Sequence, residues 1–137
     1  MDHPIVFISQ FAIRAGKLEG LKLLADQVAE QLEAEKPQTL AFLIYLDDDG
    51  ARITFVHLFA NPAAMDLHFR GADKRSRTAS EFLDPVGWEI FGQPSDAALA
   101  EMRKTATSAG AALTIQPDFA AGFVRFGPGN GRNLTVA

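Results

Sequence analysis

The sequence predicts one α+β domain whose elements follow the order β-α-β-β-α-β, with a further helix and short strands after them. Three observations support this prediction. Apolar residues alternate with period two in four segments, they recur at spacings of three and four in the segments between, and glycine or proline separates the two kinds. A chain of 137 residues is enough for one hydrophobic core. We therefore expect a single domain over 1–137, with a core at about 4–93, a C-terminal extension at 94–126 and a mobile tail at 127–137.

The first strand is expected over Pro4–Ile13, and it is apolar on both of its faces. Phe7 and its alternate neighbours share one face, while Ile8 and its alternate neighbours share the other. A strand of this kind is buried on both sides, so we place it in the centre of the sheet. The next segment, Lys17–Lys36, has the apolar spacing of an amphipathic helix, and Pro37 ends it.

A hairpin follows. Alternating apolar residues predict strands over Leu40–Leu46 and Ile53–Ala60. The sequence Asp-Asp-Asp-Gly over 47–50 joins them, and Asp-Gly between two apolar runs is a strong hairpin signal. These three aspartates lack the spaced ligands of a calcium loop, so we interpret the segment as a turn.

The second half of the chain contains a helix, a strand and a third helix. Asn61 caps the first of these helices, Pro62 occupies its first turn, and Gly71 stands where such a helix ends. Ser95 caps the later helix. The remaining predicted elements are a helical turn over Ser76–Phe82 and strands over Val86–Phe91, Leu113–Gln116 and Gly122–Phe126.

Two right-handed βαβ halves produce a four-stranded antiparallel sheet of the ferredoxin-like kind, with the helices on one face. Several strands are apolar on both faces, so the other face also needs cover. A second copy of the chain, packed sheet to sheet, would provide this cover. The C-terminal extension, folded over the same face within one chain, is the alternative. We expect the homodimer.

Composition excludes several classes of function. The net charge is −4 and no long basic run is present, which argues against nucleic acid as the partner. The chain has no cysteine, so disulfides and cysteine-ligated metals are excluded. No apolar run reaches the length of a membrane span, and the N-terminus lacks the pattern of a signal peptide. We therefore expect a cytoplasmic protein that contacts neither membrane nor nucleic acid.

Four segments together resemble the antibiotic-biosynthesis-monooxygenase family of the dimeric α/β-barrel superfamily. The main one is FVHLFANPAAMDLH over 55–68, and the others are IRAGK over 13–17, LIYLD over 43–47 and WEIFGQP over 88–94. The match covers about 4–93. It implies homodimers with a pocket in each subunit, between the sheet and the second helix. Members of this family include cofactor-free oxygenases acting on aromatic polyketides, heme-degrading enzymes and enzymes of small signalling molecules.

Two departures narrow what the resemblance implies. His57 stands where family members often have a glutamate, so a carboxylate role is lost there. The heme-degrading branch uses an asparagine on the first strand, a tryptophan and a histidine. Here the comparable first-strand position is Ser9 or Gln10, and His68 falls near the tryptophan position. We therefore disfavour heme degradation and expect no cofactor.

His68 and His57 are the candidate catalytic residues. An imidazole with a pKa near 6.5 can take a proton from a phenol or an enol, or donate a hydrogen bond to it. For each histidine, the alternative is a structural role: His68 as a helix residue with one hydrogen bond, His57 as a core residue bonded to backbone. Two histidines eleven residues apart without a third ligand are a weak metal signal, so we expect no metal.

The candidate substrate-binding residues are aromatic, apart from one amide. Tyr45 and Trp88 combine a ring with a polar tip, and Gln10 is an isolated amide on an apolar strand face. Phe55, Phe59 and Phe69 complete the set. The alternative for the aromatic residues is ordinary packing. A basic group at Arg70, Lys74, Arg75 and Arg77 is either an anion-attracting surface or a solvated face.

These residues lead to three hypotheses. The first is a cofactor-independent monooxygenase that binds a small hydrophobic or aromatic molecule in a phenylalanine-lined pocket of each subunit. The second is a non-catalytic module of the same dimeric fold that binds a small ligand or serves a stress response. An isomerase or decarboxylase activity on a small carbonyl compound would use the same histidines.

Overall fold

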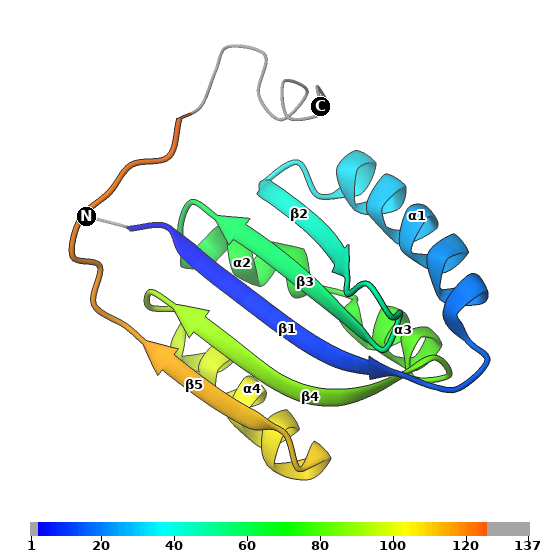
Figure 1. Cartoon of the computed structure of the whole chain (residues 1–137). Helices are drawn as coiled ribbons and strands as arrows, with labels where there is room; N and C mark the ends of the chain where they lie inside the picture. The colour runs from blue at the N-terminus through cyan, green and yellow to red at the C-terminus, as the bar shows by residue number, and fades with distance from the viewer. Residues whose placement is uncertain (1–2, 126–137) are drawn as a thin grey trace.

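One sheet organises the molecule in the computed structural model, which describes residues 3–125. Its strands lie in the order β2-β3-β1-β4-β5, so β1 is central, as the sequence predicts (Figure 1). Strands β1 to β4 pair with one another in antiparallel fashion, and β5 joins parallel to β4. The strands are β1 (Ile5–Ile13), β2 (Thr39–Leu46), β3 (Arg52–Phe59), β4 (Leu83–Phe91) and β5 (Ala112–Gln116).

The helices pack on one face of this sheet and leave the other face open. They are α1 (Leu18–Glu35), α2 (Pro62–Phe69), α3 (Ala72–Ala79) and α4 (Asp96–Ala109). Side chains of β1 alternate strictly at its start: Ile5 and Phe7 are buried beneath the helices, and Val6 and Ile8 are partly exposed on the open face. The predicted ferredoxin-like α+β fold is confirmed. It carries a fifth strand, because α4 forms a further crossover that adds Ala112–Gln116 to the edge.

Two helices begin at the residues that the sequence predicts. The Asn61 side chain accepts a hydrogen bond from the Ala64 amide at 2.8 Å, and Ser95 accepts one from the Ala98 amide at 3.1 Å. Gly71, with φ of 81°, separates α2 from α3 in the left-handed conformation that glycine adopts without strain. The predicted turn over Ser76–Phe82 is therefore a full helix that begins earlier, at Ala72.

Two expectations about strands were wrong. The strand expected from Val86 begins earlier, at Leu83. Pro85 does not interrupt it, because Pro85 lies beside a bulge and β5 begins to pair with β4 only at Gly87. The missing amide proton of Pro85 therefore costs no hydrogen bond between strands. Residues 122–125 of the strand expected over Gly122–Phe126 form no strand. The tail predicted over 127–137 lies outside the described residues.

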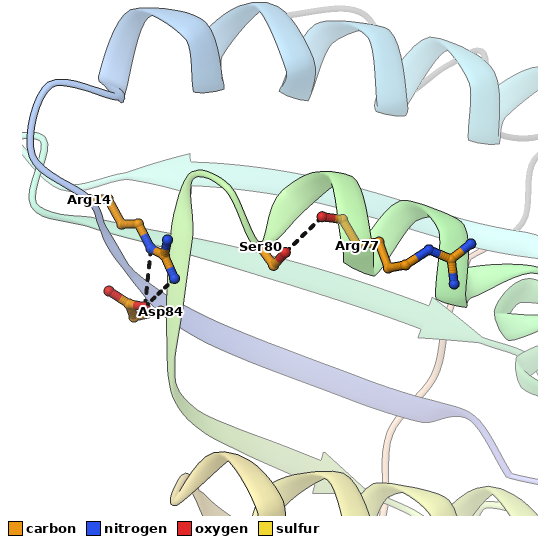
Figure 2. A network of polar contacts seen from close by, with 4 residues as sticks. All are labelled: Arg14, Arg77, Ser80 and Asp84. Carbon is orange, nitrogen blue, oxygen red and sulfur yellow. Dashed lines mark hydrogen bonds and ion pairs between the residues drawn. The ribbon is translucent and has the colours of Figure 1, made fainter.

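An exposed ion pair joins the end of β1 to the start of β4. Arg14 donates through Nε and Nη2 to one oxygen of Asp84, at 3.2 Å and 3.0 Å, and nearby Ser80 donates to the Arg77 carbonyl at 2.7 Å (Figure 2). Because both charged groups of the pair are solvated, the pair contributes at most about 1 kcal/mol. Within residues 3–125, no helix is long and apolar enough to cross a membrane.

Candidate functional site

Two histidines lie against each other between β3 and α2. The centroids of the His57 and His68 rings are 5.0 Å apart, with the ring planes at 84°. His57 comes from the helix-covered face of β3, and His68 comes from the underside of α2. Only 5% of His57 and 2% of His68 is exposed. The fold thus brings together the two residues that the sequence selects as catalytic candidates.

Phenylalanine rings surround this pair. Phe42 of β2 lies 5.1 Å from His57 and 6.1 Å from His68, measured between ring centroids. Phe59 lies 5.2 Å from His68, and Phe69 lies 4.9 Å from the same ring. Phe7 of β1 closes the group at 5.1 Å from His57. The two imidazoles are therefore the polar part of an aromatic cluster that fills the space between the sheet and α2.

One hydrogen bond fixes the tautomer of His57. Its Nδ1 lies 3.1 Å from the carbonyl oxygen of Phe7. A carbonyl oxygen only accepts, so Nδ1 carries the proton and donates it. In the neutral ring Nε2 then carries the free lone pair. A histidine that acts as a general base is commonly oriented in this way, with its other nitrogen bound to an acceptor.

His68 is held by a hydroxyl group. Its Nδ1 lies 2.6 Å from Oγ1 of Thr39. A hydroxyl both donates and accepts, so either tautomer of His68 satisfies this bond. The hydrogen bond therefore fixes the tautomer of His57 but not that of His68.

Burial keeps both imidazoles neutral. It lowers the pKa of His57 to about 4, against the opposing effect of the hydrogen bond to Phe7. Burial also lowers the pKa of His68 to about 3, and the positive charges of Arg75 and Lys36 add to the effect together with any charge on His57. At neutral pH each ring is therefore uncharged and can accept a hydrogen bond or a proton. The same burial makes each ring a weaker base than a free imidazole.

Thr39 is a site residue that the sequence analysis missed. Strict alternation along β2 would place it with Ala41 on the open face. A bulge between Thr39 and Ala41 pairs Thr39 with Phe59, on the face that the helices cover. No glycine or proline stands within residues 38–44 to indicate this bulge.

Two cations hold the C-terminal end of α2, above the histidines. Nζ of Lys36 donates to the carbonyls of Leu67 at 2.9 Å and Arg70 at 3.0 Å, and Arg75 donates to the carbonyl of His68 at 2.9 Å. These are carbonyls that a helix end leaves without partners, at its negative pole. Arg75 of the basic group therefore has a structural role, while Arg70, Lys74 and Arg77 are exposed.

The sheet separates the predicted substrate-binding residues into two sets. Phe55, Phe59, Phe69 and Trp88 lie on the helix-covered side with the two histidines. Gln10 and Tyr45 lie on the open face, where Thr54 stands between them as the pairing partner of both. A small molecule that touches His68 therefore cannot touch Gln10 or Tyr45 without crossing the sheet.

The open face is mainly aliphatic. Its central residues are Val6, Ile8, Val56, Leu58 and Leu43, with Phe91 beside Val6. Polar groups on this face include the Tyr45–Thr54–Gln10 row and Glu89, which pairs with Ile8. On β5, Thr114 and Gln116 are level with Glu89 and Phe91. No helix among residues 3–125 covers it (Figure 1).

An open groove lies elsewhere, between α4 and β5. It has a volume of about 470 Å³ and is lined by Arg103, Ala106, Thr107, Ala111, Leu113 and Ile115. None of the predicted site residues lines it. In the part of the chain that the structure describes, no three histidine, aspartate or glutamate side chains gather closely enough to hold a metal ion.

Solved structures share this fold. MupZ from Pseudomonas fluorescens superposes with a TM-score of 0.67 at 14% identity, over 91% of both chains. Rv0793 from Mycobacterium tuberculosis superposes with a TM-score of 0.57 at 21% identity, over 69% of this chain and 98% of that one. A "putative antibiotic biosynthesis monooxygenase" from Caulobacter crescentus gives 0.56 at 16% identity, over 65% of this chain and 88% of that one. No family model and no curated protein matches the sequence.

These likenesses confirm the fold that the sequence resemblance predicts, that of the antibiotic biosynthesis monooxygenases. The last two cover about two thirds of the chain, which is the share of residues 4–93. The likeness to MupZ is longer and so extends into the region after β4, where α4 and β5 lie. At these identities the likeness concerns the fold and not the chemistry.

Proposed function

We propose that this protein is a cofactor-independent monooxygenase-like enzyme for a small hydrophobic, aromatic molecule, and that it works as a homodimer. The observation that carries the proposal is the neutral imidazole of His57, oriented by the Phe7 carbonyl inside a phenylalanine cluster. The same fold in three proteins named "putative antibiotic biosynthesis monooxygenase" supports the reaction class.

The chemistry asks little of the protein beyond a proton acceptor and dry surroundings. His57 takes a proton from an activated CH₂ of the substrate, and the carbanion passes electrons to O₂. Overall, the CH₂ and O₂ give a carbonyl and water. Because a base with a pKa of about 4 holds a proton weakly, His57 releases it to the reduced oxygen within the turnover. The aromatic rings bind the planar substrate and exclude water.

Dimerisation through the open sheet face is part of the proposal. Val6, Ile8, Val56 and Leu58 form an apolar surface without helix cover among the described residues, and a second sheet packed on it would remove it from water. Light scattering at micromolar concentration tests this. Ile8→Lys is expected to convert a dimer to a monomer, whereas Thr105→Lys, at an exposed position of α4 on the other side of the sheet, leaves it dimeric. A wild-type chain that is monomeric would refute the assembly.

Oxygen uptake with anthrone-type substrates tests the activity. Replacing His57 by Gln is expected to lower kcat/KM by about a hundredfold or more, the size of a general-base contribution. His3→Gln, at an exposed histidine, is the matched control, and circular dichroism verifies that each variant folds. Uptake that survives His57→Gln together with His68→Gln would exclude this mechanism.

One observation favours the alternative, a non-catalytic small-ligand-binding module. Both imidazoles are almost fully buried, and each already has a hydrogen-bond partner within the chain, so both satisfy the requirements of structural core histidines. Calorimetric binding of an anthrone-type ligand without oxygen uptake would support the module over the enzyme.

A further inference from the structure

Ser9 is a buried polar residue in the middle of the helix-covered sheet face. It follows Ile5 and Phe7 in the alternation of β1, so its side chain points to the same side as theirs, and only 4% of the residue is exposed. Its partners on the neighbouring strands are Phe55 of β3 and Trp88 of β4. A small polar side chain therefore stands between two large aromatic ones.

The helices cover the surroundings of Ser9 incompletely. The core consists of two clusters, one that includes residues of α2 and α4 and one that includes residues of α1 and α3. Along β1, Phe7 belongs to the first cluster and Phe11 to the second, so Ser9 lies where one gives way to the other. Phe11, Phe55 and Trp88 are all partly exposed although they point to the helices. Rings with free surface of this kind favour contact with an aromatic ligand.

The hydroxyl of Ser9 has no hydrogen-bond partner in the described chain. Ser9, His57 and His68 are the buried polar residues among residues 3–125, and each of the two histidines is bonded to another residue. No side-chain nitrogen or oxygen that is sealed from solvent in this part of the chain lacks a partner. The Ser9 oxygen therefore keeps accessible surface, and its proton is free to be donated.

His57 is a diagonal neighbour of Ser9 on the same face. It pairs across the strands with Phe7, two residues before Ser9. Diagonal neighbours in a sheet lie about 7–8 Å apart, which is too far for a hydrogen bond between two short side chains. A planar aromatic molecule between them can touch both side chains at once.

We propose that the Ser9 hydroxyl binds the oxygen of the substrate, an aromatic ketone whose carbonyl is conjugated with the CH₂ that loses the proton. This role of Ser9 rests on the proposed function. When His57 takes the proton, the electron pair of the C–H bond enters the conjugated system and the negative charge develops on the carbonyl oxygen. Ser9 donates its hydrogen bond to that oxygen, and the bond strengthens as the charge grows. O₂ then accepts the electrons, as in the overall reaction above.

Turnover of anthrone with O₂ gives the first measurement. Ser9→Ala removes the hydroxyl and leaves a small side chain in β1. The variant is expected to lower kcat by about a hundredfold, the effect of one donor at a developing oxyanion. KM is expected to rise less, because the hydrogen bond is stronger in the transition state than in the ground state. Ser108→Ala, at an exposed serine of α4, is the matched control, and circular dichroism verifies that both variants fold.

A second measurement needs no turnover. Anthrone with a heavy carbon isotope at its carbonyl is bound in the absence of O₂, and infrared difference spectroscopy reads the C=O stretching frequency. A donated hydrogen bond lowers this frequency, so bound anthrone is expected to have a lower frequency in the wild-type protein than in Ser9→Ala. Equal frequencies would overturn the role of Ser9 even if kcat falls, because the loss would then come from packing.

The two measurements separate the Ser9 hydrogen bond from the proposed reaction. A frequency difference without O₂ uptake by the wild-type protein would support the Ser9 bond and favour the non-catalytic module. Uptake that depends on His57 but is unchanged in Ser9→Ala, with equal frequencies, would refute the Ser9 bond and leave the oxygenase. Anthrone that does not bind to the wild-type protein would overturn both.

Discussion

The two faces of the sheet carry similar residues and have different surroundings. Along β3, Phe59 and His57 point to the helices, while Leu58 and Val56 point to the open side. Residues of α2 bury the first pair, and no helix covers the second in the described part of the chain. The apolar residues of a strand therefore show that both sheet faces need cover. The connections between the strands decide which of the two faces receives the helices of the same chain.

Neighbouring residues of β3 offer the largest test of this difference. Phe59→Ala is expected to lower the free energy of unfolding by about 3–5 kcal/mol, because it leaves a cavity in the closed core. Leu58→Ala, measured in the Ile8→Lys background as a monomer, is expected to cost less than half as much. Urea unfolding measures both. Equal losses would show that the open face is packed within a single chain.

Acid sharpens the comparison, because the buried histidines lie on the helix-covered side only. The pKa of His57 is about 4 in the folded state and about 6.5 in the unfolded state, so the unfolded state binds more protons as the pH falls below 6.5. The stabilising effect of the neutral ring is therefore complete above pH 6.5 and declines as the pH falls toward 4.

For His57 alone, the expected loss in the free energy of unfolding between pH 7 and pH 5 is about 2 kcal/mol. Urea unfolding at the two pH values measures it, and His57→Gln is the comparison because an amide can still donate to the Phe7 carbonyl. The variant is expected to show a smaller pH dependence. The same dependence in both proteins would contradict a depressed pKa at His57.

The smallest effect concerns the bond that holds His68. Thr39→Val keeps the shape of the side chain and removes the hydroxyl, so His68 Nδ1 loses its partner. We expect the free energy of unfolding to fall by about 1–2 kcal/mol, the cost of an unsatisfied buried group. Thr39→Ser retains the hydroxyl and is expected to recover part of that loss. If Thr39→Val and Thr39→Ser have the same free energy of unfolding in urea, the hydrogen bond to His68 contributes nothing to stability.

Much of the fold was predictable because its signals are local. Alternation placed β1 in the centre, Asp-Gly placed the hairpin, and Asn61 and Ser95 placed the starts of two helices. The errors come from long-range effects. Pro85 by itself predicts the boundary of a strand. The strand nevertheless continues through it, because β5 does not pair with β4 at Pro85.

The candidate site was predictable in its residues and only partly in its arrangement. His57 was selected as a histidine between phenylalanines on one strand face, and His68 for its position on the helix that lines the pocket in the resembled family. The fold brings the two into contact. Gln10, selected as an isolated amide, and Tyr45, selected as a ring with a polar tip, lie across the sheet, because the sequence does not decide which strand face the helices cover. Thr39 could not be found, since it reaches His68 through a bulge that the local sequence does not encode.

The hydrogen bonds from Lys36 and Arg75 to the end of α2 have a kinetic consequence. An eight-residue helix does not persist by itself, so α2 lasts only while its end carbonyls keep these partners and its apolar side stays packed. A molecule from solvent that reaches the two imidazoles must wait for this short helix to lift. The rate of that opening sets an upper limit on the rate at which a ligand reaches the two histidines. Amide hydrogen exchange in α2 measures it.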